Sequence, residues 1–284
     1  MSIIQKAVQT QSERRAEAQT AGVGATGQST APARPVIQRP STVAAFAPLL
    51  ASGFLQIESG DPVSRSELRH LKRSVLQCAL GPVADARANV VMITSPLPGA
   101  GKTFLSANLA MALAMEKDRS TLLIDADDTR ATISRALGLH GLPGFFDVLQ
   151  DPSLPLDACI HPSDVPGLEF VPAGRRFDDS LELLTSNRAR DLVHRLADEN
   201  RDRLIVLDCP PLLGTPNAGA ISAIVGQILV AVVAGETSRE SISQALELLN
   251  RDKPIGLVLN KISRARLMSM SHGGYYSYDV SAED

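Results

Sequence analysis

The chain has 284 residues, of which 44% are hydrophobic, and a formal net charge of −3. This length and composition predict one sizeable core with flexible ends, and the near-neutral charge argues against general binding to nucleic acid. Cys78, Cys159 and Cys209 are too few and too widely spaced for a disulfide framework or a zinc site. With no apolar run long enough to span a membrane and no signal peptide, these features are typical of a reduced, cytoplasmic protein.

Residues 1–60 are expected to form a flexible N-terminal arm and linker. The first 40 residues are rich in Gln, Ala, Thr, Ser, Gly and Pro and show little apolar periodicity. The apolar stretch at 43–55 is short and is broken by Pro48 and Gly53. We expect the folded domain to span residues 61–262 and a flexible tail to follow over residues 263–284.

An amphipathic helix is predicted over residues 65–80. Apolar side chains recur at helical spacing from Leu68 to Leu80, and Ser66 is suited to cap the first turn. The domain therefore begins with a helix that precedes the first strand.

Residues 89–103 read NVVMITSPLPGAGKT, a β-strand that runs into a glycine-rich turn. Residues 99–101 have little side-chain bulk, so several backbone N–H groups can meet phosphate oxygens together. Lys102 adds a charge over the β and γ phosphates, and the Thr103 hydroxyl can hold Mg²⁺. A helix predicted at 103–116 places its N-terminus at the phosphates. This pattern predicts a nucleoside triphosphate site, although Pro96 replaces the first glycine of the P-loop motif.

The rest of the sequence alternates apolar runs with helical patterns. The runs are nearly continuous in apolar residues, which is typical of parallel strands buried on both faces. With right-handed crossovers, they predict an α/β fold: a doubly wound, mostly parallel sheet of the P-loop NTPase type with helices on both faces. The strands are expected at 90–94, 120–125, 168–172, 203–208, 227–233 and 255–260, and the later helices at 187–199, 215–224 and 238–250.

Carboxylates stand where two of these strands end. Asp125 ends the run LLID, and Asp127 lies two residues later. Asp208 ends the run LIVLD and precedes Cys209, Pro210 and Pro211, a pattern suited to holding Mg²⁺ directly or through water. One of the first two acids could orient a metal-bound water while the other approaches an incoming hydroxyl. Asp128 is expected to be solvated. Arg130 could neutralise phosphate, pair with a neighbouring subunit or simply lie on the surface.

The only tyrosines of the chain, Tyr275, Tyr276 and Tyr278, all lie in its last ten residues. A buried tyrosine normally contributes packing area and a hydrogen-bonded hydroxyl, so a domain without tyrosine attached to a tail with three suggests a separate use for these hydroxyls. Accidental composition of a disordered terminus is the alternative.

The segments SPLPGAGKT, LLIDADDTR, VLDCPP and GLVLNK, together with the tyrosine-rich tail, resemble the ATPase domain of bacterial tyrosine kinases, over most of residues 50–278. These are P-loop autokinases of exopolysaccharide synthesis. The sequence is most similar to the separate-chain type that accompanies exosortase-linked (PEP-CTERM) polysaccharide systems, in which the longer spacing from Asp127 to Arg130 often occurs.

The resemblance implies an ATP-dependent protein tyrosine autokinase that regulates exopolysaccharide synthesis or export and uses ATP and Mg²⁺. It implies Mg²⁺ ligands at Thr103, Asp125 and Asp208 and phosphate acceptors at Tyr275, Tyr276 and Tyr278 of a neighbouring subunit. The implied catalytic residues are Lys102, Asp125, Asp127 and Asp208, and the implied nucleotide-binding residues are Pro98, Gly99, Ala100, Gly101, Lys102, Thr103, Phe104 and Asn260.

The family also carries a helix before the P-loop that binds the next subunit of a ring. The matching positions here are Glu67, His70 and Arg73, with histidine in place of the usual arginine. A solvated helix face is the alternative. The resemblance further implies a homo-oligomer, ring or dimer, and a membrane-anchored polysaccharide copolymerase as activator, so that the protein would lie at the inner membrane only through this partner.

Two other functions stay open at this point. One is a partition-type ATPase switch, but those proteins carry a second lysine near the start of the P-loop, where this chain has Leu97, and they tend to lack a tyrosine tail. The other is an adaptor that binds ATP and activates its membrane partner without turnover.

Overall fold

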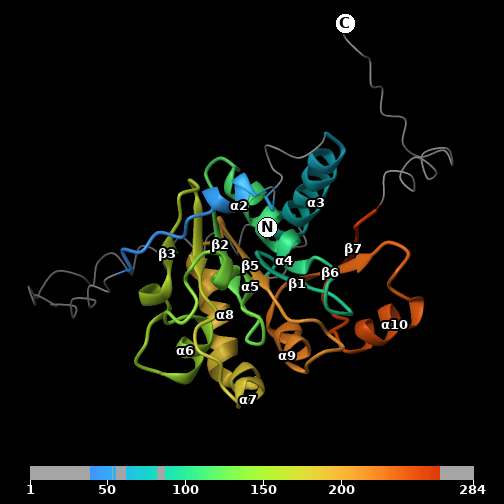
Figure 1. Ribbon diagram of the computed structural model, residues 1–284. Helices are drawn as coiled ribbons and strands as arrows, with labels where there is room; N and C mark the ends of the chain where they lie inside the picture. The colour runs from blue at the N-terminus through green and yellow to red at the C-terminus, as the bar shows by residue number, and fades with distance from the viewer. Residues whose placement is uncertain (1–38, 53, 56–61, 82–86, 263–284) are drawn as a thin grey trace, which may run out of the picture. The chain divides into compact units, whose positions relative to one another are not determined.

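The computed structural model describes residues 39–52, 54–55, 62–81 and 87–262 (Figure 1). Within these residues one seven-stranded sheet has the order β3-β4-β2-β5-β1-β6-β7, and neighbouring strands are parallel except β3, which runs antiparallel to β4. The predicted doubly wound, mostly parallel sheet is confirmed. The strands are β1 (Val90–Thr94), β2 (Ser120–Asp125), β3 (His161–Pro162), β4 (Leu168–Val171), β5 (Arg203–Asp208), β6 (Gln227–Val233) and β7 (Ile255–Asn260).

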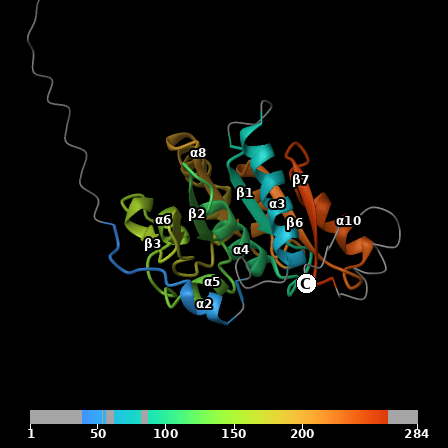
Figure 2. The same ribbon diagram turned by 90° about the horizontal axis from the view of Figure 1, so that it is seen from above.

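Helices cover both faces of this sheet (Figures 1 and 2). One face carries α2, α3, α4 and α5, and the other carries α6 to α10. Their bounds are α2 (Ala47–Ala51), α3 (Pro62–Leu80), α4 (Lys102–Ala114), α5 (Thr132–Ala136), α6 (Phe145–Gln150), α7 (Ser180–Thr185), α8 (Asn187–Glu199), α9 (Asn217–Ile224) and α10 (Arg239–Glu247), with a 3₁₀ turn at Leu156–Cys159.

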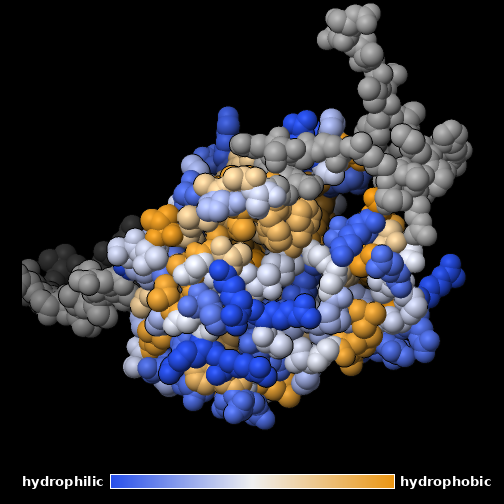
Figure 3. Space-filling model, in the orientation of Figure 1, coloured by the Kyte–Doolittle hydropathy of each residue, from blue (hydrophilic) through white to orange (hydrophobic). Residues whose placement is uncertain are grey.

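The central strands are buried on both faces, as their apolar sequences predict. Every residue of β1 and β6 is buried, and so is every residue of β2 and β5 after the first. α4 is also buried on nearly all sides, because it lies between the sheet and α3. In contrast, α8 buries one apolar stripe that includes Leu192 and Val193, and its other face is polar. Hydrophilic side chains accordingly dominate the lower part of the surface in Figure 3.

Sequence periodicity located the long elements but missed the short ones. The predicted strands at 120–125, 203–208, 227–233 and 255–260 and the helix at 187–199 are confirmed to the residue. β3 and the short helices α2, α5, α6 and α7 were not predicted, because an element of two to six residues is too short to show a period.

The segment 39–55 corrects one sequence prediction. The sequence places it in a flexible arm, but the structure packs residues 39–52, 54 and 55, here called the N-terminal strap, against the domain. Ala44, Phe46 and Leu55 are fully buried. The Ala44 amide donates to the Pro162 carbonyl at 2.8 Å, so the strap extends the sheet edge beyond β3. Residues 1–38 of the predicted arm lie outside the described residues.

Side chains of the domain hold the strap at several points. The carboxylate of Asp164 accepts from the Phe46 and Ala47 amides at 2.7 and 2.9 Å and thereby caps α2. Arg39 forms an ion pair with Glu169 at 2.6 Å. The Phe46 ring meets the Phe170 ring edge-on, with centroids 6.4 Å apart. Apolar burial and capping together explain why this segment is ordered despite its broken periodicity.

Removal of the Asp164 cap provides a test of the strap. We expect Asp164→Ala to lower the free energy of unfolding by about 1–2 kcal/mol, because two amides at the start of α2 lose a charged acceptor. Urea denaturation followed by circular dichroism measures this change, with Asp178→Ala, at an exposed acid, as the matched control. Equal stability of the two variants would contradict the assigned cap.

Candidate active site

The P-loop connects β1 to α4 at the carboxyl edge of the sheet. Gly99 and Gly101 adopt left-handed φ angles of 83° and 85°, which side chains rarely tolerate. A Cβ atom on Gly101 would also overlap the side-chain amide of Asn260. These two constraints explain why the turn needs glycine, and they leave backbone N–H groups near the start of α4, the arrangement that binds phosphate.

The loop after β5 holds the first part of the P-loop in place. The Leu212 and Leu213 amides donate to the Ser95 and Pro96 carbonyls at 2.8 and 3.1 Å. The Thr94 hydroxyl donates to the Pro210 carbonyl at 2.7 Å. Pro96 therefore takes part in this contact through its backbone carbonyl oxygen. Because glycine has the same carbonyl, proline in place of glycine does not remove this hydrogen bond.

The P-loop lysine forms a buried ion pair with the second acid of the LLIDAD segment. The Nζ atom of Lys102 lies 2.7 Å from Oδ2 of Asp127, and the two side chains are 8% and 1% exposed. The other oxygen of Asp127 accepts from the Thr129 and Arg130 amides at 3.2 and 3.0 Å. The structure thus joins two predicted catalytic residues that are 25 positions apart, and it fixes the orientation of the Asp127 carboxylate from its own loop.

Asp125 is buried and its two oxygens are occupied. Oδ2 accepts from the Ser134 amide and hydroxyl at 2.9 and 2.7 Å, and Oδ1 accepts from the Asp127 amide at 3.2 Å. The Ser134 hydroxyl in turn accepts from the Ala173 amide at 3.0 Å. In this state Asp125 orients the loop that carries Asp127 and connects it to the end of β4.

Asp208 lies beside this pair, at the end of β5. Its Oδ1 atom accepts from the Ser106 hydroxyl at 3.1 Å, whereas its buried Oδ2 atom has no hydrogen-bond partner. A buried carboxylate oxygen without a partner is costly unless a cation or a water meets it. The residues present therefore fit Mg²⁺, for which Asp208 and the nearby Thr103 hydroxyl would be ligands. Within the described residues, no group of three or more His, Cys, Asp or Glu side chains forms a metal site by itself, so phosphate and water oxygens would complete the coordination.

Burial and mutual charge alter the pKa of Asp208, Asp125 and Lys102. Burial raises the pKa of Asp208 to about 7, while the Lys102 ammonium lowers it and the Asp125 carboxylate raises it. Burial likewise raises the pKa of Asp125 to about 6, against the lowering effect of the hydrogen bonds from Ser134. Burial alone lowers the pKa of Lys102, but the charges of Asp208 and Asp127 reverse this and raise it. A bound cation favours the ionised carboxylates.

Two further predicted nucleotide-binding residues make contacts at the P-loop: Asn260 reaches the turn, and Phe104 lies in the first turn of α4. The Asn260 side-chain amide donates to the Ala100 carbonyl at 2.9 Å, which brings the end of β7 to the phosphate turn. The Phe104 ring meets the Phe54 ring edge-on, with centroids 5.7 Å apart, so in this structure it anchors the N-terminal strap. Asn108 supports this contact by donating to the Phe54 carbonyl at 3.2 Å.

Three of the remaining predicted residues lie on α3 rather than at the P-loop. Glu67, His70 and Arg73 are exposed along α3 at intervals of three positions, and Arg130 is exposed beside the acidic loop. Tyr275, Tyr276 and Tyr278 lie outside the described residues. Predictions about the ring interface and the phosphate acceptors therefore stay predictions.

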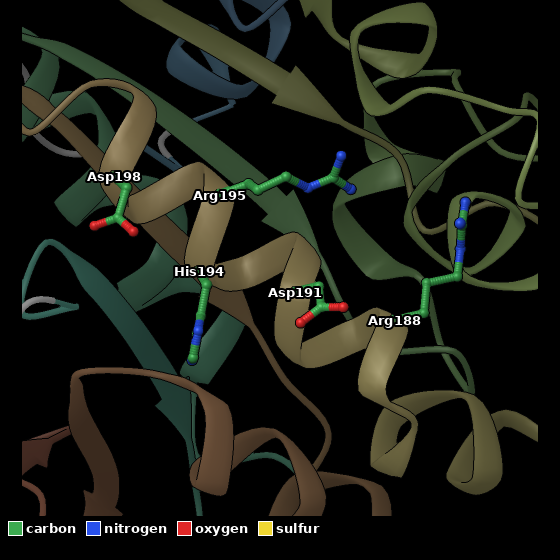
Figure 4. A pocket seen from close by; sticks show the side chains of 5 residues that line it. All are labelled: Arg188, Asp191, His194, Arg195 and Asp198. Atoms are coloured by element: carbon green, nitrogen blue, oxygen red, sulfur yellow. The ribbon is translucent and has the colours of Figure 1, made fainter.

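A pocket on the outer face of α8 is a poor alternative site. Its lining residues, Arg188, Asp191, His194, Arg195 and Asp198, all come from this one helix, and their side chains point in different directions rather than toward one point (Figure 4). The clustered, buried and charged groups lie at the P-loop instead.

Sequence reasoning missed two serines that support the acids. Ser106 and Ser134 bind Asp208 and Asp125, and nothing in the local sequence marks either serine. The prediction that Asp128 is solvated is wrong. Its Oδ2 atom accepts from the Ser180 hydroxyl at 2.7 Å and from the Asn217 amide at 3.0 Å.

Residues 88–255, which include the P-loop and the strands with the acidic ends, match the AAA domain family. The chain belongs to this family. The chain is 31% identical over 213 residues to tyrosine-protein kinase ptk of Acinetobacter johnsonii, covering 74% of this chain and 28% of ptk. It is 28% identical over 194 residues to tyrosine-protein kinase YwqD of Bacillus subtilis, covering 68% and 79% of the two chains.

Solved structures agree with this assignment. The kinase domain of the Escherichia coli tyrosine kinase ETK matches this chain with a TM-score of 0.63 and 25% identity, over 79% of this chain and 84% of that one. The BceF tyrosine kinase domain matches with a TM-score of 0.59 and 26% identity, over 74% and 86%. The resemblance to bacterial tyrosine kinases is confirmed, and the exosortase-linked subtype stays a prediction. The chain spans only 28%, 24% and 22% of the first three curated relatives.

The raised pKa of Asp208 predicts how stability depends on pH. Its value is higher in the folded state (about 7) than the ordinary value of 3.8, so the ionised form destabilises the fold. This group's contribution to stability is present below about pH 4 and is lost as the pH rises to about 7. In Mg²⁺-free, nucleotide-free buffer, we expect Asp208→Asn to exceed the wild type in unfolding free energy by on the order of 2–4 kcal/mol at pH 8, and to match it near pH 4.

Urea denaturation at several pH values measures this difference, with Asp178→Asn as the exposed control. A difference between Asp208→Asn and the wild type that does not vary with pH would show that Asp208 does not titrate in this range.

Proposed function

We propose that this AAA domain is an ATP-dependent protein tyrosine kinase that transfers the γ-phosphoryl group of ATP to tail tyrosines of a neighbouring subunit. The buried Lys102–Asp127 pair beside the P-loop turn carries this proposal, because it places a phosphate-binding cation and a proton acceptor together. The names of the relatives support the same class of reaction, since ptk, YwqD and ETK are tyrosine kinases.

The ion pair implies an exchange of partners when the nucleotide binds. Phosphate oxygens at the P-loop compete with Asp127 for the Lys102 ammonium, and the shift of Lys102 to the phosphates frees Asp127 Oδ2. The free carboxylate remains oriented through its other oxygen by the Thr129 and Arg130 amides. It can then accept a proton from an incoming hydroxyl.

Transfer follows from these positions. The phenolic oxygen of a tyrosine attacks the γ-phosphorus, the bond from that phosphorus to the β–γ bridging oxygen breaks, ADP leaves, and the phenolic proton passes to Asp127. Lys102 stabilises charge on the phosphate oxygens during the transfer. Thr103 and Asp208 would hold Mg²⁺, which would further neutralise the charge of the phosphates. Asp125 keeps the loop oriented through its bonds to Ser134 and Asp127.

The proposal extends to assembly and partners. Three exposed polar residues on α3, Glu67, His70 and Arg73, are available to a neighbouring subunit, which would receive phosphate on Tyr275, Tyr276 or Tyr278. Phosphates on the tail add negative charge and would weaken its docking on the next subunit. None of the described helices is long and apolar enough to cross a membrane. Regulation of polysaccharide export would act through a membrane-anchored copolymerase, as the resemblance to the bacterial tyrosine kinases implies.

Phosphate mapping tests the proposed reaction. Protein first treated with a phosphatase is incubated with ATP and Mg²⁺, and phosphate is located by mass spectrometry. We expect modification of Tyr275, Tyr276 or Tyr278 in the wild type, and a loss on the order of 10²-fold or more in Lys102→Met, because charge stabilisation at the phosphates is removed. Lys117→Met, at an exposed lysine, is the matched control.

A mixture of variants tests transfer between subunits. Lys102→Met, which retains its tyrosines, is mixed with a variant in which all three tyrosines are replaced by phenylalanine. Phosphate on the Lys102→Met chain would establish transfer between chains. ADP formation with an unmodified tail in the wild type would instead favour the ATPase switch.

A further inference from the structure

Asp128, which follows Asp127 in the acidic loop, forms a polar junction with two other side chains. Its Oδ2 atom accepts from the Ser180 hydroxyl at 2.7 Å and from the Asn217 side-chain amide at 3.0 Å. The same amide also lies 3.0 Å from the Ser180 hydroxyl, so the three side chains contact one another. We call these three residues the Asp128 junction.

The junction joins three segments that are distant in sequence. Asp128 follows β2, Ser180 is the first residue of α7, and Asn217 is the first residue of α9, after β5. Ser180 and Asn217 are 7% and 5% exposed, so their donors have little access to water and depend on the carboxylate. Hydrogen bonds to an ionised acceptor are stronger than neutral ones, which makes this junction a firm attachment.

The adjacent residue, Asp127, is held by a different segment of the chain. Its side chain binds Lys102, while that of Asp128 binds the α7 and α9 segments. Besides the bonds of Asp125 to Ser134 and to the Asp127 amide, two side-chain constraints from other segments hold the loop between β2 and α5, one at Asp127 and one at Asp128. When phosphates draw Lys102 away, the first constraint is lost and the Asp128 junction remains.

We propose that Asp128 is a positioning residue that keeps the Asp127 carboxylate in place once Lys102 has moved to the nucleotide. This inference rests on the proposed function for the role of Asp127 as proton acceptor. Because a misplacement of about 1 Å at a reacting group can reduce a rate on the order of 10²-fold, loss of the junction acts on turnover. ATP affinity depends on the P-loop and Lys102 and is largely retained.

Two substitutions at position 128 distinguish the effect of the hydrogen bonds from the effect of the negative charge. Asparagine at position 128 retains an oxygen that accepts from Ser180 and Asn217, whereas alanine retains none. Asp128→Asn should therefore rescue most of what Asp128→Ala loses. A junction that acts only through negative charge near the site would show equal defects in both variants.

The test combines three measurements on Asp128→Ala, Asp128→Asn, Asn217→Ala, the double variant Asp128→Ala/Asn217→Ala, and the control Asp198→Ala at an exposed acid of α8. ADP formation gives kcat and KM for ATP, a fluorescent ATP analogue gives Kd, and hydrogen–deuterium exchange reports on peptides covering residues 126–131. ADP formation detects transfer to tyrosine or to water, and mass spectrometry of the tail separately decides the kinase proposal.

We expect Asp128→Ala to lower kcat on the order of tenfold to a hundredfold, to change Kd by less than about twofold, and to speed exchange in the loop. Adding Asn217→Ala should cause little further loss, since the two residues act through one junction. Unchanged exchange in the loop, unchanged kcat with faster exchange, or an equal defect in Asp128→Asn would each overturn the inference. If the wild type forms ADP but no phosphotyrosine, the kinase proposal fails while these comparisons still decide the role of Asp128. If the wild type forms no ADP, hydrogen–deuterium exchange decides. Exchange in the loop that is unchanged in Asp128→Ala overturns the inference, and exchange that is faster in Asp128→Ala but returns to the wild-type rate in Asp128→Asn supports it.

Discussion

The buried ion pair between Lys102 and Asp127 is the constraint around which the site is organised. An ammonium with 8% of its side chain exposed can stay charged only if carboxylates compensate for the lost hydration, and the ends of β2 and β5 supply them. This cluster therefore requires that β2 and β5 are neighbours in the sheet, as their paired register from Ser120 with Arg203 to Asp125 with Asp208 ensures. The P-loop, at the end of β1 beside β5, completes the arrangement.

The burial of these acids explains why polar side chains lie next to them. Asp125 binds Ser134, Asp208 binds Ser106, and Asp128 contacts two segments beyond the site. Buried charges remain tolerable when each has hydrogen-bond partners, and such networks also restrict side chains to one orientation. Asp208 Oδ2 is the exception, and its unmet hydrogen-bonding capacity points to the cation that a nucleotide brings.

The N-terminal strap adds a connection between the start of the domain and the P-loop helix. Its Phe54 ring packs on Phe104, one residue after Thr103, and Asn108 donates to the Phe54 carbonyl. At its other end the strap extends the sheet edge at β3. Phe46 and Leu55 of the strap are completely buried. They pack with apolar residues of α4 and the sheet, and so keep this apolar surface from water.

The sequence by itself determined the sheet, the P-loop and the acids at the strand ends. Continuous apolar runs specify buried parallel strands, and the glycines at 99 and 101 are required by local backbone geometry that no other residue satisfies well. Only the tertiary structure decided that Lys102 pairs with Asp127 rather than with Asp125 or Asp208, that Asp128 is bound rather than solvated, and that residues 39–55 pack on the domain. These features depend on contacts between segments far apart in sequence. Serines such as Ser106 and Ser134 leave no local pattern, because their role arises from which carboxylate the fold places beside them.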